Sequence, residues 1–159
     1  MSNLTKSNFR RRAKVETNEC GLALAANIFG DKWVLLILRE AFYAVVRFED
    51  IQKDIGIPRA ILSTRLARLV DQGILIKQPY QEPKSRIRHS YHLSKKGRTL
   101  AKVLVAMMEW GNEYLLKSEP KLAIVDVKSK SPLRIGLFDK NNCEVPIKFI
   151  ALEPINKKL

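Results

Sequence analysis

The chain has 159 residues, of which 46% are hydrophobic, and its formal net charge is +13. This length accommodates one well-buried domain with an appendage and excludes two full-sized domains. No apolar run approaches the roughly 18 residues of a membrane-spanning helix, and the basic N-terminus lacks the apolar block of a signal peptide, so we expect a cytoplasmic protein with no membrane partner.

The two cysteines, Cys20 and Cys143, lie far apart in the sequence. Neither has the CxxC or Cys/His spacing that is typical of a zinc site, and two cysteines do not make a disulfide framework. We therefore expect at least one free thiol, no metal and no other cofactor.

Most of the positive charge falls in one quarter of the chain. Residues 59–102 hold eleven Lys and Arg residues against Asp71 and Glu82. A solvated basic surface is the simpler interpretation of scattered lysines, but a concentrated block of this kind is typical of a face that binds phosphates. The charge alone favours nucleic acid, with an acidic lipid or protein as the alternative.

The first predicted elements are two short core helices. Small and apolar residues recur at helical spacing over residues 21–29, and Gly30 then ends the helix. Asp31 is a suitable N-cap for a second helix through residues 33–40, which carries a broad apolar stripe.

A pair of helices joined by a short turn follows. Residues 45–48 predict a short strand and residues 48–55 a short helix, which Gly56 and Pro58 end. A longer helix runs from about Pro58 to Gln72 and ends at Gly73. Two helices with a glycine-containing turn between them have the outline of a helix-turn-helix.

The longer helix has a buried and an outward face. Its apolar stripe consists of Leu62, Leu66, Leu69 and Val70. Arginines, a hydroxyl group and small apolar groups on the other side suit the major groove, where Arg can bridge the O6 and N7 atoms of guanine. The candidate DNA-binding residues here are Arg59, Ala60, Ile61, Ser63, Thr64, Arg65 and Arg68, of which Arg65 and Arg68 are expected to read bases. An ordinary amphipathic surface helix is the alternative.

A basic hairpin comes directly after this helix. Residues 73–77 and 90–93 read as strands, and the polar connection between them carries Lys84, Arg86 and Arg88. Such a hairpin is typical of a wing, whose tip contacts the DNA backbone or the minor groove. These three residues complete the predicted DNA-binding set.

Ser94 is expected to cap one long helix, whose apolar stripe extends from Leu100 to Leu115. The stripe is longer than a compact winged domain needs for its own core, so it predicts a dimer surface together with the N-terminal helix. Packing of the stripe under the C-terminal tail is the alternative.

After Pro120 the sequence becomes rich in β-forming residues. Residues 122–127, 132–139 and 143–152 suggest two or three antiparallel strands, too few for an independent core. The predicted fold class is α+β, mainly α: a winged helix-turn-helix with dimerisation helices and a small C-terminal β extension. The segments are a basic N-terminal segment 1–19, a winged-helix domain 20–118 and the extension 119–159.

Over roughly residues 20–116 the chain resembles the HxlR family of winged-helix regulators, relatives of the MarR group. The resemblance is carried by Cys20, Gly30-Asp31-Lys32-Trp33, Ile37-Leu38-Arg39-Glu40, Arg47-Phe48, Ile55-Gly56-Ile57, Leu62-Ser63-Thr64-Arg65-Leu66, Leu69, Gly73-Ile74-Leu75, Tyr91-His92-Leu93-Ser94, Gly97, Leu100 and Trp110. It implies a dimeric transcription factor that binds double-stranded DNA.

The chain departs from the family pattern in a slightly longer wing, in Ser90 where Glu is frequent, and in Ala60 where Lys is frequent. The target sequence therefore cannot be copied from a relative. Cys20 matches a cysteine that some members use to sense oxidants or electrophiles, so the resemblance implies an oxidant or small-molecule effector and makes Cys20 a candidate redox sensor. A small buried side chain is the structural alternative for Cys20.

An enzyme finds little support in the sequence. His89 and His92 both fall in the predicted wing, and no carboxylate pair, nucleophile motif or phosphate-binding glycine loop occurs, so we expect no catalytic residues. A non-specific binder of RNA or chromatin is the alternative from another class. Residues 59–102 contain only Tyr80 and Tyr91 as stacking aromatics, which favours duplex DNA.

Overall fold

The computed structural model describes residues 16–150. They form two compact units, residues 28–133 and residues 16–27 together with 134–150. Most of the predicted basic segment 1–19, and the end of the last predicted strand, lie outside the described residues. A short 3-10 helix, η1 (Thr17–Glu19), precedes helix α1 (Gly21–Phe29). Helix α1 has the predicted bounds.

Three helices build the core of the unit formed by residues 28–133: α2 (Lys32–Phe42), α3 (Phe48–Ile55) and α4 (Arg59–Asp71). Each contacts the other two, and each turns an apolar stripe inward. The buried core consists of Val34, Ile37, Leu38, Ala41, Ile51, Ile57, Leu62, Leu66, Leu69, Ile74 and Leu75. The predicted stripe of α4 therefore forms the core, with Val70 at its margin.

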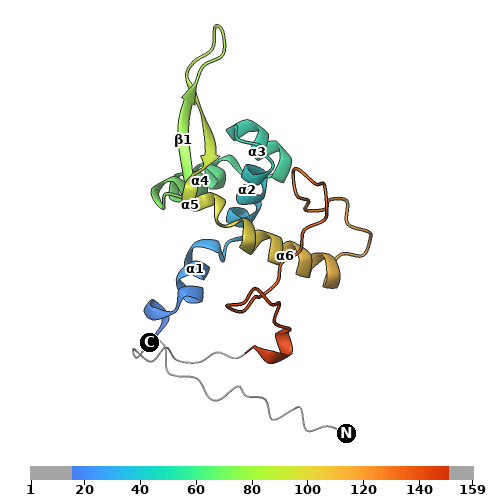
Figure 1. Cartoon of the computed structure of the whole chain (residues 1–159). Coiled ribbons are helices and arrows are strands. Elements are labelled where there is room, and N and C mark those ends of the chain that lie inside the picture. Colours follow the sequence, from blue (N-terminus) through green and yellow to red (C-terminus); the bar gives the residue numbers. More distant parts are fainter. Residues whose placement is uncertain (1–15, 151–159) are drawn as a thin grey trace. The chain divides into compact units, whose positions relative to one another are not determined.

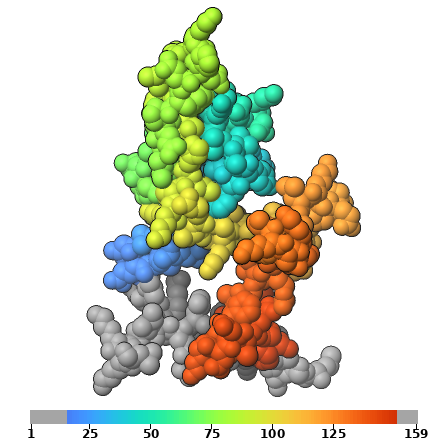
Figure 2. Space-filling view, turned by 45° about the horizontal axis from the view of Figure 1, so that its top comes forward, coloured from blue at the N-terminus to red at the C-terminus, as the bar shows by residue number. Residues whose placement is uncertain are grey.

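A two-stranded antiparallel hairpin, the wing, follows α4. It pairs β1 (Leu75–Tyr80) with β2 (Arg88–Leu93), in a register that places Leu75 opposite Leu93 and Tyr80 opposite Arg88. In Figure 1 the wing extends away from α2, α3 and α4, and Figure 2 shows its green tip standing beyond the cyan atoms of α2 and α3.

The strands of the wing differ from the predicted bounds for a physical reason. The predicted strand at residues 45–48 is reduced to a bridge between Arg47 and Ser90, next to a 2.7 Å hydrogen bond from the Tyr91 N–H to the Val46 carbonyl. This contact makes β2 the inner strand and β1 an edge strand. An edge strand tolerates Pro79, which has no N–H to donate, so β1 continues beyond residue 77.

The helix predicted from Ser94 onward is broken into α5 (Lys95–Arg98) and α6 (Ala101–Tyr114). Ser94 caps α5 as predicted, because its hydroxyl accepts the Gly97 N–H at 2.9 Å. The same hydroxyl donates to the Gly73 carbonyl at 2.7 Å, which ties α5 to the base of the wing.

The C-terminal extension forms fewer strand pairs than expected. Its described part contains two isolated antiparallel bridges, Val125 with Pro132 and Phe138 with Glu144, and a 3-10 helix, η2 (Ile147–Phe149). The Asp126 and Asp139 carboxylates each accept two backbone N–H groups of the loop that follows. These side chains stabilise tight turns, but pairs this short form no regular sheet.

Within residues 16–150 no single helix is long and apolar enough to cross a membrane. Helices α1 and α2 reach the length and apolar composition of a membrane-spanning segment only when taken together, and the pair is bent by 84°.

Candidate DNA interface

The turn between α3 and α4 fixes the geometry of the helix-turn-helix. Gly56 adopts a left-handed conformation with φ of 64°, which a glycine accommodates without strain, and its N–H donates to the Gln52 carbonyl at 3.0 Å. Ile57 is buried in the core, and Pro58 is the N-cap residue of α4. The chain therefore leaves α3 sharply and presents the first turn of α4 at the surface.

Most of the predicted residues of α4 lie on its exposed face. Exposed are Arg59, Ala60, Ser63, Thr64 and Arg68, whereas Ile61 and Arg65 are partly buried. Ile61 packs against the core. The Thr64 hydroxyl donates to the Ala60 carbonyl at 2.9 Å, and the Arg59 guanidinium lies 4.8 Å from the centre of the Phe48 ring. The structure thus brings five of the seven residues to one solvent-facing surface.

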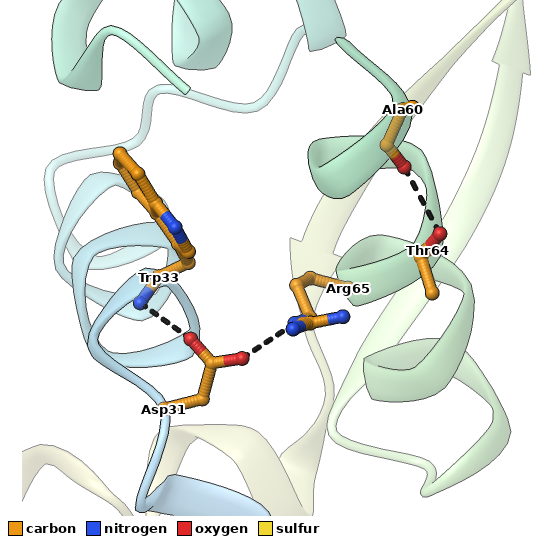
Figure 3. A network of polar contacts seen from close by, with 5 residues as sticks. All are labelled: Asp31, Trp33, Ala60, Thr64 and Arg65. Atoms are coloured by element: carbon orange, nitrogen blue, oxygen red, sulfur yellow. Dashed lines mark hydrogen bonds and ion pairs between the residues drawn. The ribbon is translucent and has the colours of Figure 1, made fainter. Parts of the chain in front are cut away.

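The Arg65 side chain forms an ion pair with the residue that caps another helix. Its Nε donates to Oδ2 of Asp31 at 2.5 Å, while Oδ1 of Asp31 accepts the Trp33 N–H at 2.8 Å (Figure 3). The side chains of Arg65 and Asp31 are 31% and 23% exposed. Asp31 is therefore both the N-cap of α2 and the ion-pair partner of Arg65.

The ionisation of Asp31 reflects these contacts. Burial raises the pKa of its carboxyl, but the Trp33 N–H and the Arg65 guanidinium lower this pKa by more, with a smaller contribution from the Val34 N–H. The pKa consequently lies below the ordinary value of 3.8. Asp31 is a carboxylate at neutral pH, and its charge offsets that of Arg65.

The wing presents its predicted basic residues at and near its tip. Lys84 and Arg86 are exposed, and Arg88 is partly buried at the start of β2. Arg47, which the sequence analysis named in the family pattern but not among the DNA-binding residues, connects the wing to the start of α3. Its Nη1 donates to Oε1 of Glu82 at 2.8 Å, and its guanidinium lies 4.9 Å from the centre of the Tyr80 ring.

A notch of about 300 Å³ opens between the wing and the helix-turn-helix. Its lining residues are Phe48, Glu49, Arg59, Arg86, Ile87, Arg88, His89 and Tyr91. Three arginines and one acidic residue, Glu49, are among the lining residues, so the charge along the notch favours an anion. Each of the three arginines is predicted from the sequence as a DNA-binding residue, but only the tertiary structure places them along one notch.

Helix α6 carries an apolar stripe that is exposed in the single chain. Val103, Met107, Trp110 and Tyr114 are 47%, 49%, 55% and 62% exposed. Their spacing of four, three and four residues places them on one face, as in the seam between two packed helices. On a neighbouring face, Leu100 and Leu104 pack against the core.

Cys20 lies immediately before α1. Its carbonyl accepts the Leu24 N–H at 2.9 Å, and its side chain is a partly buried free thiol. Cys143 is a second free thiol and is exposed. Among residues 16–150, no group of three or more His, Cys, Asp or Glu side chains is arranged to hold a metal ion.

The sequence profile of HxlR-like helix-turn-helix proteins matches residues 28–119, more than half of the chain. An uncharacterized HTH-type transcriptional regulator of Mycobacterium bovis, Mb3122, is 44% identical over 95 residues. The match covers 60% of this chain and 59% of the relative, so the chain spans less than two thirds of the relative's length.

Two solved structures share the fold. PA1607 superimposes with a TM-score of 0.74 at 29% identity, over 84% of this chain and 94% of PA1607. The reduced form of the transcriptional regulator YodB from Bacillus subtilis superimposes with a TM-score of 0.51 at 25% identity, over 63% of this chain and 98% of YodB. The predicted winged helix-turn-helix fold and the family resemblance are confirmed.

Proposed function

Because the chain belongs to the family of HxlR-like helix-turn-helix proteins, we propose that it is a transcriptional regulator that binds specific double-stranded DNA sites as a homodimer. The observation that carries this proposal is the notch between α4 and the wing, where Arg59, Arg86 and Arg88 converge. A DNA backbone that passes along the notch places one phosphate among these groups. The exposed face of α4 then meets the major groove.

We assign two kinds of contact to this surface. Ala60, Ser63, Thr64 and Arg68 face outward along α4 and supply base contacts, with the partly buried Ile61 at their edge. Arg59, Lys84, Arg86 and Arg88 bind phosphates or the minor groove. A non-specific binder would use the second kind alone, so comparison of selected and random DNA separates the two functions.

The test compares Arg68→Ala with Arg86→Ala on a site selected from a random duplex library. Arg68→Ala is expected to cost about 1–3 kcal/mol on the selected site and little on random DNA, because it removes a base contact. Arg86→Ala should weaken binding to both and reduce the dependence of log K on log salt by about one unit, because it removes one phosphate contact. Titration by fluorescence anisotropy at several salt concentrations measures both effects.

Lys121→Ala serves as the control, since it removes one positive charge outside α4 and the wing. This variant should bind like the wild type. Equal losses on selected and random DNA for Arg68→Ala would contradict base reading by Arg68. Failure of the library selection to enrich any site would favour the non-specific binder.

Cys20 gives the proposed regulator a candidate sensor. Its partly buried thiol lies immediately before the first turn of α1, where an added group would disturb the packing of that turn. Diamide takes up two electrons and two protons as two thiols form a disulfide. We expect diamide to lower the affinity of the wild type for its site and to leave Cys20→Ser unaffected.

Cys143→Ser is the matched control, because it removes the exposed thiol and keeps Cys20. A full diamide response in Cys143→Ser assigns the response to Cys20 paired with a second copy of Cys20. An unchanged wild type, or equal losses in the wild type and Cys20→Ser, would make Cys20 a packing residue.

A further inference from the structure

We propose that Arg65 acts in DNA recognition as a positioning residue, which holds the recognition helix α4 against the start of α2 through Asp31. Arg65 thus differs from Arg68, although the sequence predicts that both read bases. The inference rests on the proposed function, since it concerns how the DNA-reading face of α4 is oriented.

The geometry of the pair supports this role. Arg65 and Asp31 are 34 residues apart in the sequence, and the pair connects the middle of α4 to the N-cap of α2. In Figure 3 the Arg65 side chain extends from α4 toward the Asp31 carboxylate, whereas the Thr64 hydroxyl turns back to the Ala60 carbonyl of its own helix. The guanidinium is thus directed at α2, whereas Thr64 is exposed and Leu66 is buried in the core.

The Asp31 carboxylate is well suited to hold the Arg65 side chain in place, because both of its oxygens accept hydrogen bonds. One oxygen accepts the Trp33 N–H and the other accepts Nε of Arg65, so the carboxylate cannot turn without losing one bond. The adjacent Lys32 ammonium lies 4.6 Å from the centre of the Trp33 ring. A charge-assisted hydrogen bond in a partly buried site is stronger and more directional than one between exposed groups.

Arg65→Ala alone does not distinguish the two roles. Loss of a base contact and loss of helix orientation both weaken binding to the selected site more than binding to random DNA. A change at Asp31 does distinguish them, because the two roles then predict opposite results.

Asp31→Asn is the informative variant. Asparagine is as good an N-cap as aspartate, so the Trp33 N–H keeps its acceptor while the charge that holds Arg65 is removed. If Arg65 reads a base, Asp31→Asn frees its guanidinium and removes a negative charge near DNA, and binding stays equal or becomes tighter. If Arg65 positions α4, binding to the selected site falls by about tenfold, within the range of mutations that act through an intervening contact.

The experiment measures affinity for the selected site and for random DNA in Asp31→Asn, Arg65→Ala and the double variant. Each single change should lower affinity for the selected site by about tenfold, and the double variant should lose no more than either single one, because both break the same link. Asp31→Asn combined with Arg68→Ala is the control, in which the two losses should multiply. Wild-type or tighter binding by Asp31→Asn, with a loss in Arg65→Ala, would overturn the proposal.

A second readout needs no DNA. The pKa of Asp31 is lowered in the folded protein, so its ionised form stabilises the fold at pH values above 3.8, and this stabilisation is lost as the pH falls through the lower folded pKa. The wild type should therefore be more stable to urea than Asp31→Asn at pH 7, and the difference should disappear in acid. In the Arg65→Ala background, replacement of Asp31 by Asn should lower the free energy of unfolding at pH 7 much less than the same replacement does in the wild type.

The DNA-binding and urea experiments distinguish failure of the proposed function from failure of the positioning role of Arg65. If the wild type selects no DNA site, the proposed function fails and the DNA role of Arg65 fails with it. If the wild type selects a site but the urea experiment shows no coupling between residues 31 and 65, the positioning role alone is overturned.

Discussion

Replacement of Met107 by glutamate is expected to convert the proposed homodimer to a monomer at micromolar concentration. Met107 lies in the middle of the exposed stripe Val103, Met107, Trp110 and Tyr114 on α6. In a two-fold symmetric interface every change occurs twice, so the variant would place two carboxylates in an apolar seam. Light scattering measures the molar mass directly.

The same change should reduce DNA binding strongly. A dimer that contacts two half-sites binds DNA about 10²–10⁴-fold more tightly than a single subunit on one half-site, and a monomer loses this gain. Lys102→Glu is the matched control: it also introduces a carboxylate on α6, but at an exposed position outside the stripe. It should remain dimeric. A wild type that is monomeric at micromolar concentration, yet binds its selected site as tightly as expected of a dimer, would show that the stripe is not a dimer interface.

Gly97→Ala is expected to destabilise the protein by about 3 kcal/mol, at the upper end of the cost of overpacking a core. A Cβ atom at residue 97 would lie 2.2 Å from the Ile74 carbonyl oxygen and 3.2 Å from Cδ2 of Leu93. The Ile74 carbonyl is backbone and accepts the Ser94 N–H at 3.0 Å, so it cannot move without disturbing the base of the wing. Urea unfolding monitored by circular dichroism measures the loss.

Gly111→Ala is the control for Gly97→Ala. A Cβ at residue 111 would meet no atom within 4 Å, and alanine has the higher helix propensity, so this variant should be unchanged or more stable by up to about 1 kcal/mol. Both variants are compared at equal protein concentration, because dimerisation raises apparent stability. Equal stability of the two variants would show that α5 shifts away from Ile74 at little cost.

Local sequence signals predicted most of the helices and their caps. Asp31 and Ser94 cap helices where their side chains can accept an N–H from the first turn, and Gly56 ends α3 where a left-handed residue is needed. The spacing of apolar residues also identified the core stripe of α4 and the exposed stripe of α6. These features depend on residues within one or two turns of each other, so a single sequence contains enough information to specify them.

Strand lengths and helix breaks were predicted less well. The wing continues through Pro79 because β1 is an edge strand. The predicted long helix is broken between α5 and α6, next to the place where Gly97 lies against the Ile74 carbonyl. In the extension, β-forming residues produce only isolated bridges. Each outcome depends on a neighbour outside the local sequence window, and propensity is a weak guide where packing decides.

The sequence by itself determined the family, the helix-turn-helix and the basic character of the surface that follows it. Only the tertiary structure decided which basic groups act together and which one turns away. Arg59, Arg86 and Arg88 come from two elements and meet at one notch, whereas Arg65 is held by an aspartate 34 residues earlier. On a helical wheel Arg65 is an outward residue like Arg68; its partner is set by how α2 packs on α4, because a long side chain at the edge of a helix reaches a neighbouring helix as readily as solvent.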